Sequence, residues 1–90
     1  MDDQIRADRV TRFIETLNQA RELGLSVIET TEFSLTLCLP YSDRIIGNPD
    51  TGVIHGGAIT TLMDTTSGSV MLGAMDVFEL CPTLDLRVDY

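Results

Sequence analysis

Apolar side chains recur at helical spacing between Asp3 and Leu23, and charged or polar residues fill the other faces. The apolar positions are Val10, Phe13, Ile14, Leu17 and Ala20. Asp2 or Asp3 can cap the start of such a helix, and Gly24 suits the left-handed position after its end. The pattern predicts one amphipathic helix whose apolar stripe lies on a sheet.

After Gly24 the spacing of the apolar residues changes, and they recur at every second position. Between Glu32 and Leu39 apolar residues alternate with smaller or polar ones, which predicts a strand with one face on the core. The inward positions are Phe33, Leu35, Leu37 and Leu39. The segment 25–30 is rich in β-branched residues and is the expected hairpin partner, and Pro40 ends the pairing.

Residues 41–54 contain glycine, asparagine and proline and predict a structured loop. Residues 55–73 are apolar or small, and their glycines and threonines are unfavourable inside an isolated helix. Small side chains permit a sheet to approach closely, so this segment is predicted to be a buried central helix. The alternation in 83–90 predicts a strand with Leu84, Leu86, Val88 and Tyr90 inward. The elements form an α+β pattern whose three strands make an incomplete sheet.

Ninety residues are enough for one domain, 1–90, with a core too small to be more than marginally stable alone. Oligomerisation is therefore expected. The formal net charge is -8, with no lysine, which argues against binding to nucleic acid or to an anionic membrane. It also opposes a phosphate-bearing ligand, so Arg44, Arg87 or a partner chain would have to provide local positive charge.

Cys38 and Cys81 have no metal-ligand spacing, and the single His55 does not complete a zinc site with them. We therefore expect no metal and two buried thiols in a reducing compartment. The acidic N-terminus does not resemble a signal peptide, and no apolar run approaches membrane-spanning length. These features predict a cytoplasmic protein.

The sequence His55-Gly56-Gly57 stands at the expected start of the central helix. Backbone N–H groups there lie at the positive end of the helix dipole, and glycines let a ligand carbonyl approach them. This predicts free amides that hold an oxygen as it gains negative charge. The alternative is an ordinary helix entry with a histidine that satisfies loop carbonyls.

Asp64 lies in the apolar part of the same helix, where a carboxylate needs a hydrogen-bond partner or a function. It is a candidate general base, or else an aspartate that is bonded to a neighbouring threonine hydroxyl or faces an interface. Asn48 is either a turn former before Pro49 or a group on the substrate side. Thr83 can orient a water through its hydroxyl, or it is an ordinary residue of the expected strand.

Gly57 and Asp64 would be about 10 Å apart along one helix, so they cannot both touch a single carbonyl carbon and oxygen. A working site therefore needs the amide end of one helix and the aspartate of a second, symmetry-related helix. This spacing predicts composite active sites across a two-fold homodimer interface. An obligate dimer would also enlarge the small core.

Together these features resemble the PaaI-like (phenylacetate-pathway type) family of hotdog-fold acyl-CoA thioesterases, over nearly the whole chain. The matching pieces are Leu39-Pro40, Asn48 with Gly52, His55-Gly56-Gly57, Asp64 and the segment 83–90. The resemblance implies a hotdog fold, in which an antiparallel sheet wraps a central helix. Family members continue for some fifty further residues, so the chain corresponds to the N-terminal portion and its sheet is expected to be incomplete.

The resemblance also implies the chemistry. Gly57 and Gly56 would hold the thioester oxygen, Asn48 and His55 would shape that side, Asp64 of the other subunit would act as base or nucleophile, and Thr83 would hold water. Coenzyme A is part of the substrate, and no other cofactor is implied. The partners are a second copy of the chain, as homodimer or homotetramer. The alternatives are a non-catalytic hotdog module that binds acyl thioesters or mediates assembly and, with less support, a hotdog dehydratase.

Overall fold

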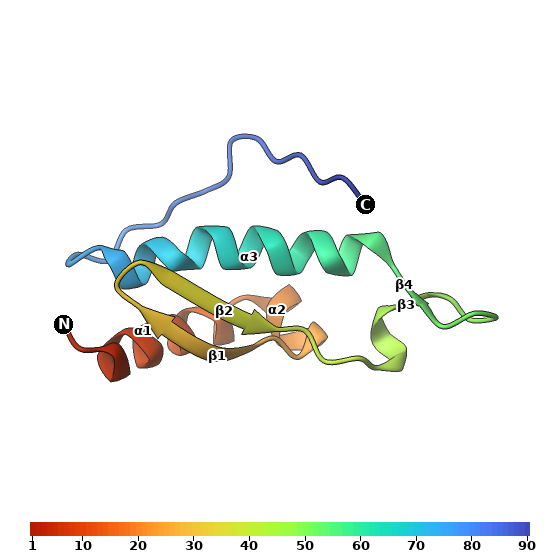
Figure 1. Ribbon diagram of the computed structural model, residues 1–90, viewed down its shortest axis with the longest axis horizontal. Coiled ribbons are helices and arrows are strands. Elements are labelled where there is room, and N and C mark those ends of the chain that lie inside the picture. The colour runs from red at the N-terminus through yellow and green to blue at the C-terminus, as the bar shows by residue number, and fades with distance from the viewer.

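The computed structural model describes residues 1–90. Two helices are followed by a hairpin, a small second hairpin and one long helix (Figure 1). The elements are α1 (Asp3–Glu15), α2 (Asn18–Leu23), β1 (Ser26–Thr31), β2 (Ser34–Cys38), the 3-10 turn η1 (Asp43–Ile45), β3 (Ile46–Asn48), β4 (Val53–Ile54) and α3 (Gly56–Ala74). This is the mixed α+β content that the sequence predicts, and α3 is the expected central helix.

The N-terminal helix is divided, so the prediction of one helix over 3–23 is wrong. The Thr16 hydroxyl donates to the Phe13 carbonyl at 2.6 Å, and Leu17 is extended with φ −88° and ψ 112°. A threonine hydroxyl that bonds the preceding turn competes with the helical pattern. The expected caps are confirmed: Asp2 Oδ1 accepts the Ile5 N–H at 2.8 Å, and Gly24 ends α2 with φ 75°.

The predicted pairing of the two segments after Gly24 is confirmed. β1 and β2 are antiparallel, with Val27 opposite Leu37 and Thr30 opposite Leu35. A bulge in β1 leaves Ile28 without a partner. Phe33 was predicted to point inward but lies in the tight turn between the strands and is 85% exposed. The strand thus begins at Ser34, two residues later than the sequence predicts.

The core lies where α1, α2 and the hairpin pack on one face of α3. Its buried side chains are Val10, Ile14, Ala20 and Leu72. Only four residues of α3 are buried, namely Ala58, Ser69, Leu72 and Gly73. On its other side Met63 and Met71 are each 41% exposed. The helix is therefore covered by the other elements on one face only, and the prediction of a buried central helix holds for that face and is wrong for the other.

The segment 75–90 leaves the end of α3 and turns back over its open face (Figure 1). The prediction of a strand over 83–90 is wrong: the segment has no strand partner, and Leu84 is fully exposed. An extended segment joins a sheet only beside another strand. Both two-stranded sheets lie elsewhere, so side-chain hydrogen bonds to α3 hold this segment instead.

The two cysteines are not the buried thiols that the sequence predicts. Cys38, in β2, is half-buried, and Cys81 is exposed because it lies on the segment that leaves α3. No helix has the length and apolar character needed to cross a membrane.

Candidate active site along the central helix

His55 caps the start of α3 with its own side chain. Its Nδ1 accepts the Gly57 N–H at 2.9 Å, while its backbone N–H donates to the Ile45 carbonyl at 2.7 Å. The prediction of free amides in this turn is therefore wrong for Gly57, because the histidine provides the acceptor that the first turn of a helix lacks. The Gly56 N–H makes no hydrogen bond.

Both glycines have close neighbours within the chain. A Cβ added at Gly57 would lie 2.9 Å from His55 Nδ1, and one at Gly56 would lie 3.2 Å from the Tyr90 ring. The Tyr90 hydroxyl donates to the Gly56 carbonyl at 2.6 Å and also bonds the Thr60 hydroxyl. The absence of side chains here thus permits the histidine cap and the approach of the C-terminal segment.

Asp64 is half-buried and has one hydrogen-bond partner. The Thr83 hydroxyl, 19 residues away in sequence, donates to Asp64 Oδ1, and Asp64 Oδ2 accepts nothing. The sequence named both residues, and the structure brings them together within one chain. The partner that a carboxylate needs in this apolar stretch is a threonine from the returning segment, not a neighbour on α3.

A cavity of about 240 Å³ adjoins this pair. It is lined by Asp64 and Thr83 on one side and by Phe13 and Leu17 of the N-terminal helices on another. Ser69 also lines it, is completely buried, and its Oγ has no hydrogen-bond partner. In the sequence Ser69 is one small residue among several, and nothing in the pattern distinguishes it.

Replacement of Ser69 by alanine is expected to raise the free energy of unfolding by about 1 kcal/mol, because it removes a buried hydroxyl that no group satisfies. Urea denaturation measures this. The control is Ser67→Ala on the exposed side of α3, which reports the better helix propensity of alanine alone. Equal gains for both variants would mean that the Ser69 hydroxyl is not destabilising.

The other predicted site residues lie away from Asp64. Asn48 is the last residue of β3, and its Oδ1 accepts the N–H of Asp50 in the following turn at 3.0 Å. Gly57 is on the same continuous helix as Asp64, seven residues earlier, or about 10 Å along the axis. One chain therefore holds both halves of the predicted site but does not bring them to one point.

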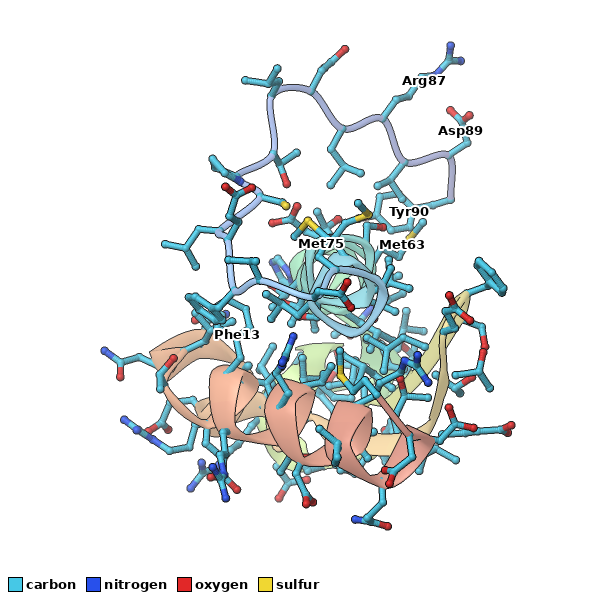
Figure 2. All side chains as sticks on the ribbon, turned by 90° about the vertical axis from the view of Figure 1, so that its left-hand side faces the viewer. Phe13, Met63, Met75, Arg87, Asp89 and Tyr90 are labelled. Carbon is cyan, nitrogen blue, oxygen red and sulfur yellow. The ribbon has the colours of Figure 1, made fainter.

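The two candidate arginines for phosphate binding are exposed and paired with acids. Arg44 Nη1 lies 3.2 Å from a Glu22 carboxylate oxygen, and Arg87 Nε lies 3.3 Å from Asp89. Figure 2 shows Arg87 and Asp89 on the outer side of the returning segment, directed away from α3. Neither arginine lines the cavity beside Asp64.

Comparison with known proteins gives one curated relative and two solved structures. A Halobacterium salinarum protein named "Putative esterase" is 34% identical over 71 residues, which are 76% of this chain and 47% of that protein. No protein-family model matches the chain. The chain thus spans about half the length of the curated relative.

The crystal structure of a Pseudomonas aeruginosa protein is 55% identical, with a TM-score of 0.82 over 94% of this chain and 63% of that one. The X-ray structure of a protein from the thioesterase superfamily is 28% identical, with a TM-score of 0.85 over 96% of this chain and 64% of that one. With the observed elements, these similarities show the α+β hotdog fold. The narrower PaaI-like assignment rests on the sequence motifs alone.

Proposed function

We propose that this chain hydrolyses an acyl-CoA thioester to a free acid and coenzyme A, with Asp64 as the base that activates water. The observation that carries the proposal is the half-buried Asp64 carboxylate, which is bonded to Thr83 and lines a cavity. The esterase name of one relative and the thioesterase superfamily of another support a hydrolase-type role. The choice of acyl-CoA follows the resemblance of the motifs.

The hydrogen bond between Thr83 and Asp64 suits a base better than a nucleophile. Because the Thr83 hydroxyl donates to Asp64 Oδ1, its own oxygen remains an acceptor for a water molecule. Asp64 Oδ2, which has no partner, is then the site that takes the proton of that water. The water attacks the thioester carbonyl carbon, and the coenzyme A thiolate leaves when the tetrahedral intermediate collapses.

The thioester carbonyl oxygen gains negative charge during the reaction and requires hydrogen-bond donors, which the Asp64 carboxylate does not provide. The Gly56 N–H is unpaired, whereas the Gly57 N–H donates to His55 Nδ1, so the proposal requires the exposed His55 ring to rotate before the Gly57 N–H can bind the substrate. Since these amides lie about 10 Å from Asp64 on one helix, we propose that they belong to the other chain of a homodimer.

Exposed apolar surface supports this assembly. Met63 and Met71 are exposed on the open face of α3, and Val77 is exposed on the segment that follows this helix. Large apolar side chains exposed in this way are typical of an interaction site. A homodimer, or a homotetramer of two such dimers, would cover it.

Coenzyme A phosphates would displace Glu22 from Arg44 or Asp89 from Arg87. Both ion pairs are exposed, and such pairs contribute little, so they present no barrier to a phosphate. The proposal therefore places positive charge at these two arginines within an acidic surface.

The second candidate is a non-catalytic module that binds an acyl thioester or mediates assembly. The pairing of the Gly57 N–H with His55 and of Asn48 with its own turn favours it, since both groups are engaged within the chain. A dehydratase would need a histidine paired with an acid, whereas His55 is bonded to a backbone amide.

A measurement of turnover distinguishes the thioesterase from the non-catalytic module. The chain is mixed with a panel of acyl-CoAs, free thiol is followed with a chromogenic reagent, and binding is measured by calorimetry. We expect each protein chain to release many equivalents of coenzyme A thiol. Binding of acyl-CoA without thiol release would support the non-catalytic module.

A further inference from the structure

The largest cavity of the molecule is not at Asp64 but beside it. It measures about 870 Å³ and lies between the outer face of α1 and the segment that follows α3. Ile5, Phe78 and Leu80 are among its apolar lining residues. Its volume is within the range of about 300–1,000 Å³ found for ligand pockets, whereas the cavity at Asp64 falls below that range.

Two side chains line both cavities, Phe13 of α1 and Leu17 at the start of α2. The Phe13 ring packs edge-to-face on Phe78, with centroids 6.0 Å apart and an interplanar angle of 64°. Figure 2 shows Phe13 between α1 and the segment that leaves α3. Phe13 and Leu17 therefore form the boundary between the cavity at Asp64 and the larger groove, and Phe78 packs on Phe13 from the side of the groove.

The wall that carries Phe78 is fixed at its base. Arg9 Nη1 donates to the carbonyls of Leu72 at 3.3 Å and Met75 at 2.9 Å, which joins α1 to the end of α3. These bonds satisfy two carbonyls that the last turn of a helix leaves free. The groove thus lies between α1 and a segment that is anchored to α1 at its base, and Phe13 and Leu17 separate the groove from the cavity at Asp64.

We propose that the groove receives the distal part of the acyl chain and that Phe13, through its contact with Phe78, determines the chain length the site accepts. The inference rests on the proposed thioesterase function, which places the thioester carbonyl next to Asp64. An acyl chain that leaves this carbonyl first fills the small cavity and then meets Phe13. Wild-type protein therefore favours short acyl groups, and longer chains require the aromatic pair to open.

The test compares butanoyl-CoA and dodecanoyl-CoA as substrates of wild type and of Phe13→Ala. The ratio of kcat/KM for dodecanoyl-CoA to that for butanoyl-CoA is expected to rise by about fourfold for each methylene that enters the groove, and thus at least about tenfold overall. Phe78→Ala should shift the ratio in the same direction. Since Phe78 is 54% exposed, this variant decides the question if Phe13→Ala does not fold.

Phe33→Ala is the matched control, because Phe33 is 85% exposed in the hairpin turn and lines neither cavity. Its ratio should equal that of wild type. An unchanged ratio in both Phe13→Ala and Phe78→Ala, with wild-type activity present, would overturn the inference and leave the thioesterase function intact.

If wild type releases no thiol from any acyl-CoA, the proposed function fails, and binding of the fluorescent fatty acid cis-parinaric acid tests the groove separately. Tighter binding by Phe13→Ala or Phe78→Ala than by Phe33→Ala supports an acyl groove closed by the aromatic pair. Equal affinities for all three variants contradict it.

Discussion

Replacing Asp64 by asparagine is expected to lower kcat for acyl-CoA hydrolysis by about 10²–10⁴-fold, the usual contribution of a general base. Asparagine keeps an oxygen that accepts the Thr83 hydroxyl, so the returning segment stays attached to α3. What it loses is the free Asp64 Oδ2, the atom that takes the proton of the attacking water. Steady-state release of coenzyme A thiol measures the effect.

Asp85→Asn provides the control, because Asp85 is an exposed acid two residues after Thr83 and has no hydrogen-bond partner in the chain. Its kcat should stay within about twofold of wild type, since substitutions of exposed residues that make no specific contact have small effects. Equal loss in both variants would point to a general effect of charge. Undiminished turnover by Asp64→Asn would refute a role of Asp64 as base.

The second large effect concerns assembly. Asp64→Ala and Gly57→Pro are each expected to be inactive, and co-refolding them at equal concentration should restore about a quarter of the wild-type sites. Proline removes the N–H that would hold the oxyanion but leaves the aspartate of its own chain in place. In a mixed dimer, one of the two sites then keeps both working halves. Thiol release by the mixture measures the recovery.

Circular dichroism of Gly57→Pro shows whether the helical content of the chain is retained, which matters because His55 caps the turn that contains the substitution. Each variant refolded alone provides the background rate. If well-folded mixed samples recover nothing, the site lies within one chain, and the argument from the 10 Å spacing is wrong.

Local signals in the sequence predicted the ends of the helices and the hairpin. Asp2, Gly24 and the small-residue stretch of α3 act through nearby backbone, so neighbouring residues suffice to predict them. The break after Thr16 was not predicted, because the apolar stripe continues across it. The exposure of Phe33 depends on which residues form the turn, and alternation alone does not show this.

The segment 83–90 shows why an alternation of apolar and polar residues does not guarantee a strand. Its alternation is as clear as that of β2, but pairing depends on a neighbouring strand, which is a property of tertiary structure. Leu84 is consequently exposed, although the sequence predicted it to be inward.

In the candidate site, residue types were easier to predict than their partners. The apolar surroundings of Asp64 showed that it needs a hydrogen bond, but Thr83 is 19 residues away and meets it only because the chain turns back over α3. For the same reason nothing in the sequence indicated that Phe13 would separate two cavities. The bond between the His55 side chain and the Gly57 N–H is local, but from the sequence we expected this histidine to bond loop carbonyls instead.

The most direct test of the central claim is a single turnover of an acyl-CoA by the wild-type chain in water labelled with ¹⁸O. If Asp64 activates water for direct attack on the thioester, mass spectrometry of the acid from this first turnover will show one ¹⁸O atom. An unlabelled acid with the label in the Asp64 carboxylate would contradict the account, since it would mean that Asp64 is a nucleophile. Failure to form any acid would contradict hydrolysis itself.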